Sequence, residues 1–187
     1  MNLAFFVGAQ YHRPFRRVMI EPDDIDDLVH EQRVGGQQAA LAAVRPGVSL
    51  RELHGVALAV VSDGIRRLGL LDSGVAGGLT DAEAALRWMP HGIGHMLGVD
   101  VHDSTAVAGE WMTAPFRAGH VITIEPGLYL SPHDQYVPEH LRGIGVRIED
   151  DVLVTAGGHD NLTAALPRSA DEVERWLAPL RAAGTPR

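Results

Sequence analysis

The spacing of apolar residues changes along the chain, and the first half has the spacing typical of helices. A helix is expected from Asp24 to Val44, because acidic residues and a proline stand at its start, although Gly35–Gly36 weakens its middle. Ser49–Glu52 has the pattern of a capping box, and the apolar residues behind it recur at helical spacing to about Leu70. Asp81–Trp88 predicts a further, short helix.

Glycine becomes frequent after Pro90, and the apolar runs shorten to the length of β-strands. A second capping-box pattern, at Ser169–Glu172, predicts a closing helix that reaches about Ala183. Helices followed by a mostly antiparallel sheet and a last helix indicate the α+β class. The expected strands are Val121–Glu125, Leu128–Leu130, Gly145–Glu149 and Asp151–Thr155.

Composition narrows the classes of function. A chain of 187 residues with 45% hydrophobic and 21% charged residues fits one soluble globular domain, residues 1–187. The net charge of −8 argues against nucleic acid as a partner, and no apolar run approaches the roughly 18 residues of a membrane span. The absence of cysteine excludes thiolate ligands and fits a cytoplasmic protein. Any metal must therefore be held by His, Asp and Glu.

Three histidines, His91, His95 and His102, lie within twelve residues and are separated by glycines. The first two have the spacing of a helical zinc motif, but no glutamate follows His91 and the glycines argue against a helix. On a glycine-rich strand or loop the histidines can converge, because glycine lets the backbone approach a ligand closely. A single histidine is more often a hydrogen-bonded structural residue, and the seven others in the chain are interpreted in that way. The cluster favours a site.

Two glutamates end apolar runs further along the chain. Glu125 follows Val121–Ile124, and Glu149 follows Ile144–Ile148. Because side chains alternate along a strand, Thr123 shares a face with Glu125, and Arg147 with Glu149. A carboxylate in apolar surroundings costs free energy unless it is paired or binds a metal. A metal site and an ion pair of either glutamate with Arg147 are therefore both open.

Three motifs in this order resemble aminopeptidase P and prolidase, metallopeptidases of the pita-bread fold that cleave at Xaa-Pro bonds. The motifs are His91–Asp103, Thr123–Tyr129 and Arg142–Asp151. The resemblance extends from about Gln37 to Trp176. It implies the C-terminal part of a pita-bread fold, with helices packed on a curved, mostly antiparallel sheet.

The resemblance also implies roles at the metal site. His95, Glu125 and Glu149 would be metal ligands, with Glu149 bridging two ions and Glu125 acting as general base or proton shuttle. Two Mn²⁺-like ions would share a hydroxide that attacks the peptide carbonyl, as in two-metal hydrolysis. Oxygen-rich ligands with one imidazole suit Mn, Co or Zn.

By the same resemblance, three more residues would act around the metals. His91 and His102 would contact the substrate and stabilise the tetrahedral intermediate. Arg147 would contact the metal ligands and not the metal. The substrate would be a peptide with proline after the scissile bond.

One departure from the family bears on activity. The family carries two metal-binding aspartates on a hairpin ahead of the histidine motif, in an Asp-x-Gly … Asp-x-Thr-Arg-Thr pattern that these 187 residues do not contain. The cluster of aspartates within residues 23–27 has no such context, and residues 1–36 are interpreted as a divergent segment of a truncated domain. Two functions stay open: a metallopeptidase with impaired or no activity, holding one ion weakly or none, and a non-catalytic structural or peptide-binding module. A truncated sheet would also expose an edge, so a homo-oligomer such as a dimer is expected.

Overall fold

The structure is a computed structural model that describes residues 35–67, 69–71, 78–103 and 110–167, with residues 172, 175, 176, 178 and 179 of the C-terminal segment. Residues 35–43 are helical, so Gly35 and Gly36 both lie within the expected first helix. Gly36 is buried, and a β-carbon there would reach Ala57 and Pro126. At Gly35, by contrast, a β-carbon would lie 2.7 Å from Val60 Cγ1, so close packing favours glycine there. The start expected at Asp24, the aspartates within residues 23–27 and Ser169 of the second capping box lie outside the described residues. Within the expected closing helix, residues 172, 175, 176, 178 and 179 are described and are helical.

The next two helices begin at capping boxes. Helix α2, Leu50–Arg67, starts after Ser49, whose backbone N–H donates to the Glu52 carboxylate at 2.8 Å. Helix α3, Asp81–Trp88, has the bounds predicted from the sequence, and its first turn is capped by Thr80. Helix α2 ends three residues before the predicted Leu70 and has basic residues in its last turn, where they favour the negative end of the helix dipole. None of the described helices is long and apolar enough to cross a membrane.

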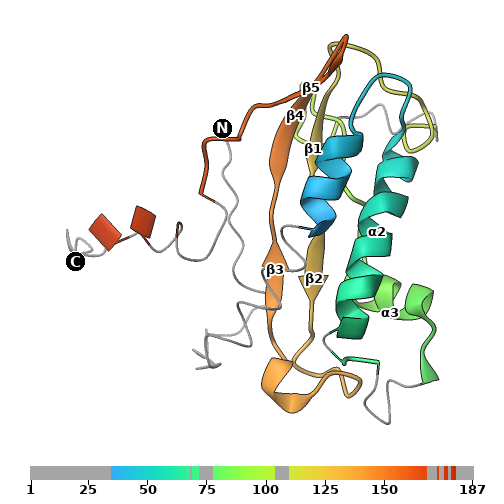
Figure 1. Ribbon diagram of the computed structural model, residues 1–187, viewed down its shortest axis with the longest axis vertical. Coiled ribbons are helices and arrows are strands. Elements are labelled where there is room, and N and C mark those ends of the chain that lie inside the picture. Colours follow the sequence, from blue (N-terminus) through green and yellow to red (C-terminus); the bar gives the residue numbers. More distant parts are fainter. Residues whose placement is uncertain are drawn as a thin grey trace.

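The strands form two antiparallel sheets that continue one into the other (Figure 1). One has the order β1-β4-β5 and the other pairs β2 with β3. Each predicted strand is present, with one or both ends shifted by one or two residues, and β5 was not predicted. The bounds are β1 Val121–Ile124, β2 Gly127–Tyr129, β3 Gly145–Arg147, β4 Asp150–Thr155 and β5 Gly158–Asn161.

Two apolar cores attach the helices to one face of these sheets. The first joins helix 35–43 and the start of α2 to β1 and β4, with Ile93 and Phe116. The second joins the end of α2 and α3 to β2 and the loop that follows it. That loop is also held by the buried Asp134, which accepts hydrogen bonds from the Arg87 guanidinium at 2.6 and 2.8 Å and from the Trp88 indole at 3.1 Å. The helices and the sheets therefore form two layers.

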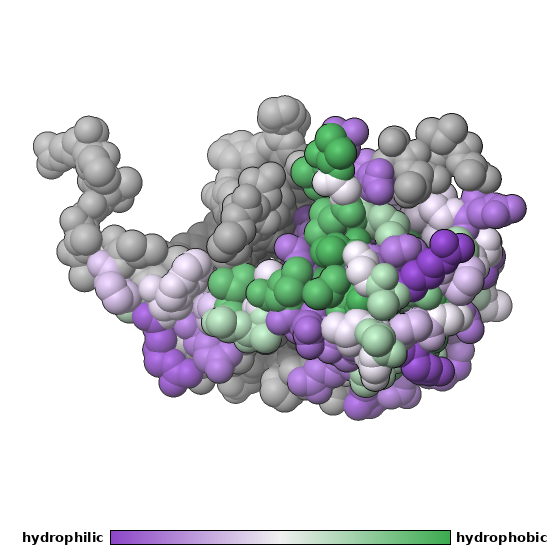
Figure 2. All heavy atoms as spheres, turned by 90° about the horizontal axis from the view of Figure 1, so that it is seen from above, coloured by the Kyte–Doolittle hydropathy of each residue, from purple (hydrophilic) through white to green (hydrophobic). Residues whose placement is uncertain are grey.

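Some apolar residues stay at the surface. Seen from above, hydrophobic residues form a band across this end of the molecule, bordered by hydrophilic ones (Figure 2). Val99 and Val101, which lie between His95 and His102, are among the exposed large apolar residues of the described part of the chain. The expectation that a second copy covers an apolar face stays a prediction.

Candidate metal centre

Strand β1 continues into β2, and β3 continues into β4, and both continuations are interrupted at the same level. Glu125 lies in the first interruption and Glu149 in the second. Ile124 pairs with Asp150 above the interruption, and Gly127 pairs with Arg147 below it. Both pairs belong to one register, so Glu125 lies directly opposite Glu149. Pro126 explains part of the break, because proline has no N–H to donate to the neighbouring strand.

Directly opposed residues point to the same face of a sheet, with β-carbons about 5 Å apart. Two carboxylates in that arrangement repel each other unless a cation lies between or beside them. The other face of the same strands carries Ile124 and Val152 and packs in the apolar core. The two glutamates therefore lie on the face turned away from the helices.

His95 reaches this face from a third, irregular strand. Residues 93–97 run antiparallel to β1 on the side away from β4, joined by the hydrogen bonds Thr123 N–H to His95 O at 2.9 Å and Glu125 N–H to Ile93 O at 2.7 Å. A β-carbon at Gly94 would lie 1.9 Å from the Thr123 carbonyl oxygen. Only glycine at this position allows such an approach, so a sequence that resembles a loop forms an edge of the sheet.

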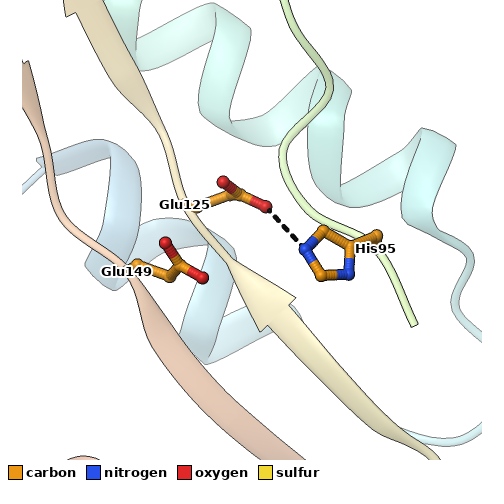
Figure 3. A group of neighbouring side chains, drawn as sticks. All are labelled: His95, Glu125 and Glu149. Atoms are coloured by element: carbon orange, nitrogen blue, oxygen red, sulfur yellow. Dashed lines mark ion pairs between the residues drawn. The ribbon is translucent and has the colours of Figure 1, made fainter. Parts of the chain in front are cut away.

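The three side chains converge (Figure 3). His95 Nε2 lies 3.3 Å from Glu125 Oε1, and one ligand atom from each of His95, Glu125 and Glu149 lies within 4.8 Å of the others. It is the one such group of possible metal ligands among the residues that the structure describes. The Thr123 hydroxyl donates to Glu125 Oε1 at 3.0 Å and accepts from the His95 backbone N–H at 3.0 Å, so it fixes both ligands.

The donor set fits a divalent ion. Around one ion, ligand atoms at about 2.0–2.3 Å from the metal lie about 3–4 Å from one another, so these side chains need only a small closure. One imidazole and two carboxylates suit Mn, Co or Zn. His95, Glu125 and Glu149 have side chains that are 14%, 12% and 26% exposed, which leaves an ion access from solvent.

Arg147 lies between the two glutamates. Its guanidinium nitrogens are 3.8 Å from Glu125 Oε2 and 3.7 Å from Glu149 Oε2. The ion pairs considered from the sequence are therefore both present, but at distances longer than a direct charge-assisted hydrogen bond. They coexist with the ligand cluster.

The two remaining histidines take separate places. His91 Nε2 is 2.9 Å from the Tyr129 hydroxyl, and its ring packs edge-on against the Tyr129 ring. His102 is exposed, and its ring centroid lies 4.3 Å from that of His95. Sequence reasoning missed Tyr129, although its position two and four residues beyond Gly127 and Glu125 places it on their face of the strand.

The pKa of Glu149 reflects its burial and its repulsion by the opposed Glu125 carboxylate. Burial raises the pKa of the Glu149 carboxyl above its ordinary value, and the Glu125 carboxylate raises it further, against the opposing effect of Arg147. The pKa of Asp151 is also raised, first by burial and then by Asp150. A cation on this face would relieve the repulsion.

A testable consequence concerns stability without metal. Because the pKa of Glu149 is raised in the folded protein, its ionised form opposes folding, fully above the raised pKa and not at all well below the ordinary value. At pH 7 in EDTA, Glu149→Gln is therefore expected to stabilise the fold by up to about 1 kcal/mol, the range for a cross-strand like-charge pair. The Tm should rise by about 2 °C. Calorimetry checks this, with the exposed Glu139→Gln as control; a lower Tm for Glu149→Gln alone would contradict it.

Comparison with known proteins shows the family. The family model for metallopeptidase family M24 matches residues 7–156. The chain belongs to this family. The match begins ahead of Gln37, where the motif resemblance starts.

Relatives and solved structures agree with this assignment. The chain is 44% identical over 159 residues to Xaa-Pro aminopeptidase 1 of Streptomyces coelicolor and 39% identical over 158 residues to Xaa-Pro aminopeptidase of Escherichia coli, in each case over 84% of this chain. It covers 32% and 34% of those proteins, so it spans about a third of their length. Proline aminopeptidase P II from Yersinia pestis has a TM-score of 0.72 at 34% identity, over 87% of this chain and 36% of that one. The α+β, pita-bread-like fold predicted from the motifs is confirmed.

Proposed function

We propose that this chain supplies the His95, Glu125 and Glu149 half of a divalent-metal site for hydrolysis of peptides with proline after the scissile bond. The observation that supports this most is the single register that sets Glu125 opposite Glu149, with His95 Nε2 3.3 Å from Glu125. Mn²⁺ is the ion we favour, since the ligands are mainly oxygen. The substrate class rests on the Xaa-Pro aminopeptidases to which the chain is similar.

The residues of the chain have distinct tasks in this proposal. A bound divalent ion lowers the pKa of water and polarises a carbonyl group. Glu125 would take the proton of the attacking water. The Thr123 hydroxyl on its Oε1 and Arg147 beside its Oε2 orient its carboxylate for that task. The Arg147 guanidinium, 3.8 Å from the Glu125 carboxylate and 3.7 Å from that of Glu149, keeps the two carboxylates from separating.

The two other histidines bind the substrate. His102 is exposed beside His95, where a peptide carbonyl can reach its ring. Both ring nitrogens of His91 are engaged, Nε2 with the Tyr129 hydroxyl at 2.9 Å and Nδ1 with Gly92 O at 2.7 Å, which fixes the ring. His102 would donate a hydrogen bond to an oxygen that gains negative charge during the reaction. His91 would do so only by giving up its contact with Gly92 O or with the Tyr129 hydroxyl.

A second function, a peptide-binding or structural module without turnover, is favoured by one observation. These 187 residues contain no pattern matching the family's aspartate hairpin, which would supply the ligands of a second ion. In a module without turnover, one ion binds weakly or not at all, and the cooperative activation of water by two ions is lost.

An assay with an Xaa-Pro dipeptide and tripeptide in millimolar Mn²⁺ separates the two functions. The enzyme proposal predicts slow release of the N-terminal residue, abolished by Glu125→Gln and unchanged in the exposed Glu110→Gln. Metal binding with no release above that of the Glu125→Gln variant would contradict turnover and support the binding module.

A further inference from the structure

A buried carboxylate lies directly behind the metal centre. Asp150 follows Glu149 in the chain and is 1% exposed. Its Oδ2 accepts a hydrogen bond from Gln37 Nε2 at 2.6 Å, and its Oδ1 accepts one from the Thr163 hydroxyl at 2.6 Å. A carboxylate at this depth needs such donors, because it has lost its water.

Asp150 and Glu149 point to opposite faces of the sheet. Asp150 pairs with Ile124 at the start of β4, and side chains alternate along a strand. The Asp150 carboxylate is therefore on the helix side, and the Glu149 carboxylate is on the open side. Whatever fixes Asp150 also fixes the backbone from which Glu149 projects.

The two donors come from different parts of the fold. Thr163 is local, since its hydroxyl also accepts the Asp151 backbone N–H at 3.1 Å. Gln37 lies 113 residues earlier, on helix 35–43, and is 2% exposed. The amide of Gln37 thus joins the helix layer to the point where the strand is interrupted.

We propose that Gln37 is a positioning residue that acts through Asp150 to hold Glu149 opposite Glu125. Without the amide, Asp150 would keep its local donor Thr163 but lose this hydrogen bond to the helix layer. The backbone at residues 148–149 lies in the interruption of the strand, where the Ile148 N–H donates to Pro126 O at 3.4 Å. The effect of Gln37 on metal binding rests on the proposed function, whereas its effect on the backbone that carries Glu149 does not.

The test compares Gln37→Met with Gln38→Met in the full chain. Methionine has a similar length and helix propensity, and Gln38 is exposed on the same helix. In metal-free protein, we expect the Ile148 and Asp151 amides to exchange with solvent about tenfold faster in Gln37→Met than in Gln38→Met, because one charge-assisted hydrogen bond is lost. The Val154 amide, which donates to His120 O further along β4, serves as internal reference and should be unchanged. Mn²⁺ affinity should fall about tenfold, as for other outer partners of metal ligands.

A reversed pair tests the same contact if Gln37→Met does not fold. In Gln37→Glu with Asp150→Asn, the amide at residue 150 donates to the carboxylate at residue 37, and exchange and Mn²⁺ affinity should return to within about threefold of the unsubstituted chain.

Equal exchange at Ile148 and Asp151 in the two methionine variants, or faster exchange that extends equally to Val154, would overturn the proposal. So would Mn²⁺ affinity unchanged by Gln37→Met, or no recovery in the reversed pair. Absence of Mn²⁺ binding by the unsubstituted chain would instead overturn the proposed metal function, and the exchange rates would still decide the role of Gln37.

Discussion

Gly94→Ala is expected to destabilise the protein by about 4 kcal/mol, the largest effect predicted for an added methyl group at any glycine that the structure describes. The added β-carbon would lie 1.9 Å from the Thr123 carbonyl oxygen and 2.8 Å from its carbon. Both atoms belong to the backbone of β1, so no side-chain rotation relieves the clash. Residues 93–97 must move away from β1 and lose the hydrogen bonds that join the two.

Urea unfolding of the metal-free protein measures this effect. Gly55→Ala is the matched control, because Gly55 lies exposed on α2 and a β-carbon there meets nothing within 4 Å. That substitution should leave stability unchanged or raise it by about 0.5–1 kcal/mol, the helix preference for alanine. A loss below about 1 kcal/mol in Gly94→Ala would show that the histidine segment does not pair with β1 in this way.

Glu125→Gln is expected to weaken Mn²⁺ binding by at least about 100-fold, beyond the effect of losing an outer partner of a ligand. The substitution keeps the volume of the side chain but removes one ligand and one of the two opposed negative charges. An amide also places a donor near His95 Nε2 or the Arg147 guanidinium, where carboxylate oxygens of Glu125 now lie at 3.3 and 3.8 Å. Loss of charge and loss of a ligand therefore act in the same direction.

Equilibrium binding of Mn²⁺ is measured from the spectroscopic signal of the free ion. Calorimetry shows that the variant still folds. Glu110→Gln is the control, since Glu110 is exposed. Affinity within about threefold of the unsubstituted chain would remove Glu125 from the ligand set.

Local patterns in the sequence predicted most of the fold. Helix α3 has the predicted bounds because the Thr80 cap and the apolar spacing act within one helix. The strand ends shifted where the predicted runs included Glu125 and Glu149, since Pro126 interrupts the ladder there. Strand β5 was missed because Gly158–Asn161 has no apolar alternation and pairs through its backbone with β4.

Local patterns in the sequence also predicted part of the site. The motifs identified the three residues that converge, and strand alternation placed Thr123 beside Glu125, where it donates at 3.0 Å. The contact between Gln37 and Asp150 could not be predicted, because it joins residues 113 apart in the chain and depends on how the layers pack. The pairing of residues 93–97 with β1 was also missed, since glycines that allow close approach resemble a loop.

Titration of the metal-free full chain with Mn²⁺ at pH 7 tests the central claim, that His95, Glu125 and Glu149 hold a divalent ion. Glu149→Gln and Glu139→Gln are titrated in parallel, with the free ion measured directly. We predict one ion bound per chain, lost in Glu149→Gln and retained in Glu139→Gln. No binding at millimolar Mn²⁺, or binding that Glu149→Gln leaves unchanged, would contradict the account.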